Sequence, residues 1–182
     1  MLNILTLSNN NLVGLRLRTL NLIRWVAIVG QILAVVTAYL YLHISFNIYI
    51  ALTIIAISVI LNIFISIKFL PIRTLSSNEA LFYLVFDSIQ LIALLYTTGG
   101  LTNPFCVLII APFIIAATYL DFYRTIVIGI VSITLLTFLA FNYLPISSST
   151  FTFNSANYSH FQILGVWFSL IISLALLLAV SK

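Results

Sequence analysis

Residues whose types and spacing could hold a small molecule are concentrated in one stretch of this chain, from Asp87 to Phe105. It ends in the sequence GGLTNPF at residues 99–105. Adjacent glycines readily end a helix because glycine adopts the left-handed conformation at little steric cost, and Asn followed by Pro suits the start of another. Two helix ends are therefore predicted to meet here. Free carbonyls would form one wall of a pocket and free amides the other.

The helix before this junction carries a polar stripe. Asp87, Gln90 and Thr97 or Thr98 follow helical spacing, so they share one face and are candidate supporting residues for the site. Twelve residues separate Asp87 from Gly99, which is roughly 18 Å of helix. We therefore expect no direct contact between Asp87 and a ligand held at the glycines.

Asp87 is the one acid well inside an apolar stretch. An ionisable group at such a depth is costly, so it is either functional or the buried partner of a tyrosine, Gln31 or Arg24. Arg24 and Gln31 are seven residues apart and share a helix face. We expect Arg24 to extend toward the membrane interface and Gln31 to face protein.

The composition identifies the class of protein that must position these residues. Apolar residues make up 63% of the chain, charged residues 5%, and the mean hydropathy is +1.27, which is typical of an integral membrane protein. A helix needs about 20 apolar residues to cross the hydrocarbon core. The sequence predicts an all-α bundle forming one domain over residues 1–182, with a juxtamembrane segment at 1–21 that contacts anionic lipid. Six spans are expected near 22–42, 48–67, 81–98, 105–120, 125–144 and 163–180.

The basic residues predict the orientation of this bundle. All seven fall at span ends that face one side: Arg16, Arg18, Arg24, Lys68, Arg73, Arg124 and Lys182. By the positive-inside rule that side is cytoplasmic, so both termini are expected inside and the protein is expected to be multi-pass in a bacterial cytoplasmic (inner) membrane. The net charge of +4 thus reflects topology, and no nucleic-acid binding is predicted.

Several kinds of chemistry are not predicted. Haem needs histidines inside the bundle, whereas His43 and His160 lie at span ends. Cys106 is the single cysteine, so neither a disulfide within the chain nor a cysteine metal site is expected. No nucleotide-binding or nucleophile motif occurs. We expect no haem, no metal and no catalytic residue.

Residues 17–31 and 87–105 resemble the membrane sensor region of the RegB/PrrB (ActS) family of redox-responsive sensor histidine kinases, which carries GGxxNPF between its third and fourth of six spans. The resemblance implies ubiquinone sensing, a homodimer, a cytoplasmic kinase domain and a response regulator as partner. It implies a quinone site formed by Gly99, Gly100, Asn103, Pro104 and Phe105. The glycines would let the ring approach the backbone, Asn103 would donate to a carbonyl, and Phe105 would stack on the ring.

The resemblance also implies a difference from the family. Family members continue from the sixth span into a dimerisation helix with a phospho-accepting histidine and an ATP-binding domain. These 182 residues hold no counterpart, so we expect an excised or truncated sensor domain that does not itself phosphorylate a substrate. The alternatives are a small membrane transporter that uses Asp87, and a scaffold protein in which the hairpin at Gly99 to Phe105 is purely structural.

Overall fold

The computed structural model describes residues 17–41, 43–68, 75–148 and 160–180. It is built from six α-helices, as predicted, together with two short 3-10 helices and one antiparallel pair of two-residue strands, β1 (Ile44–Ser45) and β2 (Ser147–Ser148). The α-helices are α1 (Leu17–Leu40), α2 (Ile48–Lys68), α3 (Ser77–Thr97), α4 (Ile110–Tyr119), α5 (Phe122–Phe141) and α6 (His160–Val180).

Four of the described helices are long and apolar enough to cross a membrane: Thr19–Leu40, Ile48–Ile67, Ser77–Thr97 and Phe122–Phe141. Two shorter apolar stretches, Pro104–Tyr119 and Val166–Ala175, lie in the regions expected to be the fourth and sixth spans. Residues 1–16 of the predicted juxtamembrane segment lie outside the described residues. α1 already begins at Leu17, five residues before the expected first span.

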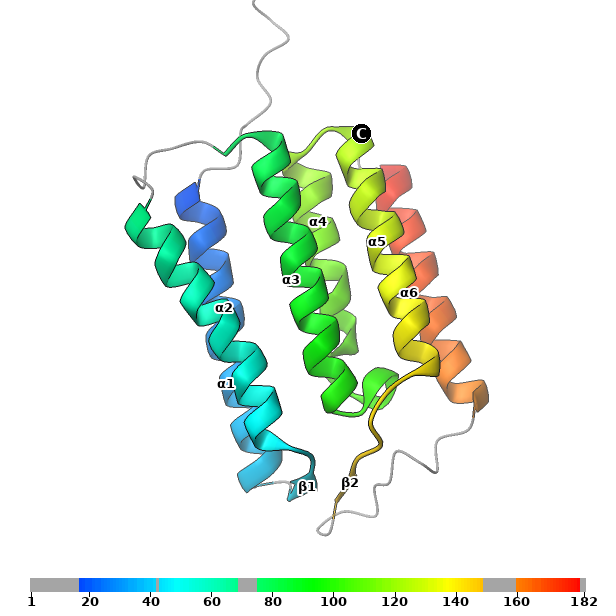
Figure 1. Ribbon diagram of the computed structural model, residues 1–182. Coiled ribbons are helices and arrows are strands. Elements are labelled where there is room, and N and C mark those ends of the chain that lie inside the picture. The colour runs from blue at the N-terminus through cyan, green and yellow to red at the C-terminus, as the bar shows by residue number, and fades with distance from the viewer. Residues whose placement is uncertain (1–16, 42, 69–74, 149–159, 181–182) are drawn as a thin grey trace, which may run out of the picture.

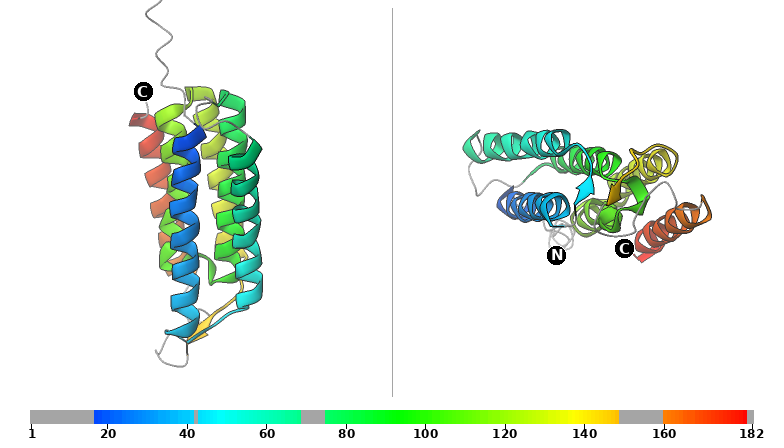
Figure 2. Two further views of the ribbon diagram at one scale, coloured as in Figure 1. Left: turned by 90° about the vertical axis from the view of Figure 1, so that its left-hand side faces the viewer. Right: turned by 90° about the horizontal axis from the view of Figure 1, so that it is seen from below.

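The helices run alternately up and down, so every connection lies at one end of the bundle or the other (Figure 1). Seen along the bundle in Figure 2, they form two rows, with α2, α3 and α5 in one row and α1, α4 and α6 in the other. α1 packs against α2, whereas α4 packs against α3, α5 and α6. One end of the bundle holds the start of α1, the ends of α2 and α6, and the start of α5 near Arg124. This arrangement agrees with the expectation that the basic residues lie on one side of the membrane.

Within the described residues, the core has three parts. One joins α3, α5 and α6 to the hairpin between α3 and α4, a second surrounds Phe113 of α4, and a third lies between the α1–α2 pair and α3. Phe113 is fully buried and packs close to Gly129 of α5, where a Cβ atom would lie 3.2 Å from the ring. Polar contacts join α1 to α2, since Asn21 donates to Ser66 Oγ over 2.8 Å.

Side-chain caps fix where α3 and α5 begin. Ser76 and Glu79 form a reciprocal capping box at the start of α3, in which each side chain accepts a hydrogen bond from the other residue's backbone N–H. Asp121 caps α5 by accepting from the Arg124 backbone, and the Arg124 guanidinium also contacts the Asp121 carboxylate and Asn78. The hydrogen bond from the Arg124 side chain lowers the pKa of Asp121 from its ordinary value.

Candidate functional site

The junction between α3 and α4 has the predicted form, with one helix ending at the glycines and another beginning at Asn103. Gly99 and Gly100 have φ angles of 103° and 62°, in the left-handed region that glycine tolerates. The 3-10 helix η1 (Gly100–Thr102) follows, and Asn103 then caps a second one, η2 (Pro104–Ile109), with proline in its first turn. The expected fourth span thus starts as a 3-10 helix and becomes α-helical only at Ile110.

The two glycines are buried beneath the segment that follows α5. A Cβ atom on Gly100 would lie 2.6 Å from Tyr143 Cβ, and one on Gly99 would lie 2.7 Å from Ile146 Cδ1. The space over both glycines is therefore filled by the protein's own side chains. Room for a ligand ring lies on another side of the hairpin.

The side chain of Asn103 holds the hairpin together. Its Nδ2 donates to the backbone oxygen of Thr98 over 3.0 Å and to Thr98 Oγ1 over 2.9 Å, while its Oδ1 accepts from the Phe105 N–H over 2.9 Å. Both N–H groups of the Asn103 side-chain amide are thereby used, and one acceptor position remains on its Oδ1. Donation to a ligand would require one of these bonds to break.

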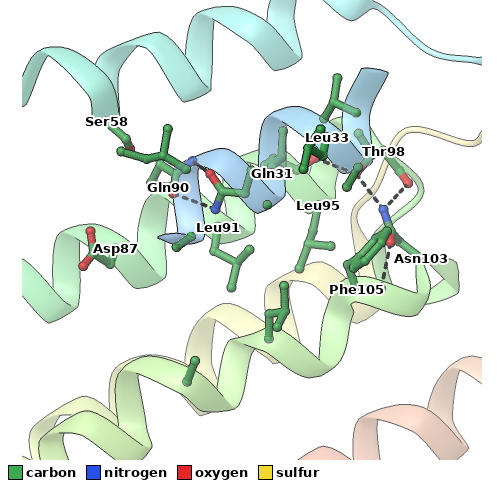
Figure 3. A pocket seen from close by; sticks show the side chains of 18 of the residues that line it. Gln31, Leu33, Ser58, Asp87, Gln90, Leu91, Leu95, Thr98, Asn103 and Phe105 are labelled. Carbon is green, nitrogen blue, oxygen red and sulfur yellow. Dashed lines mark hydrogen bonds between the residues drawn. The ribbon is translucent and has the colours of Figure 1, made fainter. Parts of the chain in front are cut away.

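A cavity of about 1160 Å³ lies on the open side of the hairpin, between α1, α3 and the η2–α4 segment. This volume is slightly above the usual range for small-molecule sites, which is about 300–1,000 Å³. Its walls are mostly apolar, and several of its polar residues follow one face of α3 (Figure 3). Six of the predicted site residues line it: Asp87, Gln90, Thr98, Asn103, Pro104 and Phe105.

The remaining predicted residues do not line this cavity. Gly99 and Gly100 shape the hairpin behind it, and Thr97 is buried with its hydroxyl donating to the Leu94 carbonyl over 2.9 Å. Asp87 and Phe105 lie toward opposite ends of the same space, as Figure 3 shows. One elongated ligand could therefore contact both, although they are far apart along the chain.

Arg24 is the principal residue that the sequence reasoning misplaced. It does not extend to the interface: its side chain is 5% exposed, and its Nε lies 3.1 Å from Asp87 Oδ1. The rings of Tyr83 and Phe86 each lie 5.7 Å from the guanidinium carbon. The physical reason is the cost of leaving Asp87 unpaired in an apolar interior, which an opposite charge offsets. Of the partners considered for Asp87, Arg24 is the one that the structure pairs with it.

A second polar contact joins α1 to α3 beside this ion pair. Gln31 Nε2 donates to Gln90 Oε1 over 3.3 Å, and Gln90 Nε2 donates to Gln31 Oε1 over 3.1 Å, as drawn in Figure 3. The prediction that Gln31 faces protein is confirmed. Two polar residues on one face of the first helix were the signal for both contacts, but the sequence did not specify their partners.

The hairpin separates the large cavity from α6. A smaller cavity of about 240 Å³ on its other side is lined by Thr102, Asn103, Pro104 and Cys106 together with Ile163 and Val166 of α6. Cys106 is buried there as a packing residue. Among the described residues, no group of three His, Cys, Asp or Glu side chains could hold a metal ion.

The fold and composition define a helical membrane domain with a large, mostly apolar cavity between its helices. Comparison with known proteins identifies its relatives. The chain is 43% identical over 131 residues to the sensor histidine kinase RegB of Cereibacter sphaeroides, covering 72% of this chain and 28% of that protein. A second protein with that name, from a designated strain of the species, is 38% identical over 76 residues, covering 42% of this chain and 16% of that one.

This chain belongs to the RegB family and is a membrane domain of that family. It spans less than a third of the length of these curated relatives. No family model matches it, and no solved structure does.

Proposed function

We propose that this chain is the redox-sensing input domain of a sensor histidine kinase and that it binds ubiquinone in the large cavity. The observation that carries the proposal is the cavity itself, which combines apolar walls with a polar stripe and includes Asn103, Pro104 and Phe105 of the GGxxNPF sequence. A quinone needs both features, because its isoprenoid tail is apolar and its ring carries hydrogen-bonding oxygens.

The hairpin residues divide into two roles in this proposal. Gly99, Gly100 and Asn103 fix the shape of the hairpin, and Phe105, 48% exposed, offers its ring to the ligand. Oxidised and reduced ligands would be distinguished because quinone carbonyls only accept hydrogen bonds, whereas quinol hydroxyls also donate. The remaining acceptor position on Asn103 Oδ1 suits a quinol hydroxyl.

The signal would leave the cavity through the hairpin. Thr102, Asn103 and Pro104 line both cavities, and the smaller one is completed by Ile163 and Val166 of α6. A ligand that favours one hairpin arrangement would thereby favour one position of α6, provided that its affinity differs between the two. With α3 as the second carrier, α6 would transmit this change toward a cytoplasmic kinase domain.

The remaining features follow from the family. We place the domain in the bacterial inner membrane with six spans and both termini cytoplasmic, as the basic residues favour. The complete kinase would act as a homodimer and transfer phosphate to a response regulator, and residues 1–182 would supply the sensing part.

A fusion protein tests this function. Residues 1–182 are joined to the cytoplasmic part of the Cereibacter sphaeroides RegB kinase, placed in lipid nanodiscs, and assayed for autophosphorylation with oxidised or reduced ubiquinone-1, a short-chain ubiquinone. Because allosteric coupling is commonly about 1–3 kcal/mol, the two states should differ by roughly 5- to 150-fold in activity. Phe105→Ala should reduce this ratio, and Phe82→Ala, at a position 66% exposed and outside the cavity, should preserve it.

Equal activity of the parent fusion in both states would overturn the proposal. It would favour the alternative in which the hairpin is structural and the domain anchors the kinase without sensing.

A further inference from the structure

The cavity has a second polar end, away from the hairpin, whose hydrogen-bonding groups are incompletely used. Arg24 and Asp87 line it, and the guanidinium contributes only its Nε–H to the ion pair. Its NH1 and NH2 atoms are buried and have no hydrogen-bond partner in the part of the chain that the structure describes. Four strong donors without an acceptor are thus buried at the edge of a mostly apolar cavity, next to the rings of Tyr83 and Phe86.

Leaving these donors unpaired is costly. A buried hydrogen-bonding group without a partner loses its interactions with water and gains nothing in return, and the loss is larger for a charged group. The flanking rings of Tyr83 and Phe86 offset part of it through cation–π contact, but an aromatic face accepts no conventional N–H···O hydrogen bond. An acceptor oxygen supplied by a ligand would satisfy donors that the protein leaves free.

The position of this end limits what the ligand can be. Asp87 is ten residues from either end of α3, or about 15 Å along the helix, so the ion pair lies near the middle of a helix long enough to span the hydrocarbon core. A phospholipid phosphate is held at the headgroup level and does not reach this depth. The acceptor must belong to a molecule that itself dissolves in the membrane interior.

Charge limits the ligand further. The formal charges of Arg24 and Asp87 cancel, so an anionic ligand would add a net charge to a mostly apolar cavity. A neutral carbonyl oxygen accepts from the guanidinium without that cost. The favoured ligand is therefore an uncharged, membrane-soluble molecule with a carbonyl group.

We infer that the Arg24 guanidinium is a binding subsite for a neutral carbonyl oxygen, at which the oxidised quinone ring docks, whereas the reduced quinol ring docks at the hairpin end beside Phe105 and Asn103. This inference rests on the proposed function and refines it. On binding, the guanidinium turns toward the cavity so that NH1 and NH2 donate to the ring carbonyl, Asp87 accepts from Nε, and the isoprenoid tail lies along the apolar walls. Since arginine donates and cannot accept, this subsite favours the oxidised ring.

The test uses the full chain in nanodiscs with ubiquinone-1 carrying ¹³C at its ring carbonyls. The variant Arg24→Met/Asp87→Leu removes donor and counter-charge together, and such replacement of a buried ion pair by apolar residues of similar size is often tolerated. Arg124→Met is the matched control, because it removes an arginine from an ion pair outside the cavity. Binding affinity and the infrared carbonyl stretching bands are measured for each protein.

We expect the parent and Arg124→Met to show one carbonyl band shifted to lower frequency on binding. The double variant should lose this shift and bind roughly tenfold to hundredfold more weakly, as expected for a hydrogen bond to a charged group. The band of the bound parent is informative even where the double variant fails to fold, since unshifted carbonyl bands in the parent would overturn the inference.

The two proposals fail in different ways. Binding of ubiquinone-1 that is equally tight in the parent and the double variant, with the same band positions, would overturn the Arg24 subsite and leave quinone binding intact. Absence of binding to the parent would overturn both.

Discussion

Substituting Gly100 by alanine should be strongly destabilising, because two independent constraints act on this position. The φ angle of 62° is in the left-handed region, where an L-residue with a Cβ atom is strained. The new Cβ would also lie 2.6 Å from Tyr143 Cβ and 2.7 Å from Tyr143 Cγ. These atoms are close to the backbone, and the next residue, Leu144, is held to α3 by a hydrogen bond from its N–H to the Tyr96 carbonyl over 2.9 Å. Tyr143 therefore cannot rotate away cheaply.

The magnitude follows from these two terms. The left-handed conformation costs about 1–2 kcal/mol for alanine relative to glycine. Forcing an extra methyl group into a packed site adds about 1–3 kcal/mol. We expect Gly100→Ala to lower the free energy of unfolding by roughly 2–5 kcal/mol.

Gly30 supplies the control. It lies inside α1, and a Cβ atom there would meet no other atom within 4 Å, so Gly30→Ala should stabilise the protein by about 0.5–1 kcal/mol through the lower entropy of the unfolded chain. Both variants can be compared by reversible unfolding with sodium dodecyl sulfate in mixed micelles, followed by the fluorescence of Trp25 and Trp167. A Gly100→Ala protein as stable as the parent would show that the hairpin is not packed as described.

Three further outcomes are expected. Asn103→Ala should lower the free energy of unfolding by about 1–3 kcal/mol, because it removes the η2 cap and both bonds to Thr98; an unchanged midpoint in the same assay would contradict the role of this side chain. A double-mutant cycle of Gln31→Leu and Gln90→Leu should give a coupling of about 0.6–2 kcal/mol, and purely additive effects would show that the reciprocal pair does not form. Arg124 lowers the pKa of Asp121, so the stability that this carboxylate contributes should be present above its unfolded pKa and be lost as pH falls through its folded pKa. Asp121→Asn should remove that pH dependence. If the free energy of unfolding falls equally steeply with acid in both proteins, the prediction is refuted.

The sequence determined the class of protein, the number of helices and the location of the hairpin. These features follow from local properties: runs of apolar residues near the length of a span, two adjacent glycines, and an Asn-Pro pair that can begin a helix. Each depends on a residue and its near neighbours in the chain, so one sequence is enough to recognise it. The polar face of α3, with Asp87 and Gln90, was equally readable because helical periodicity is local.

The tertiary structure decided what these residues contact. Arg24 pairs with Asp87, Gln31 pairs with Gln90, and the glycines are covered by Tyr143 and Ile146, which lie more than forty residues further along the chain. None of these pairings is fixed by spacing, because each depends on which helices are neighbours in the bundle and on their rotation. The sequence therefore placed the hairpin correctly along the chain, whereas the cavity between α1, α3 and α4, and the Arg24–Asp87 ion pair that lines it, exist only once those helices are packed together.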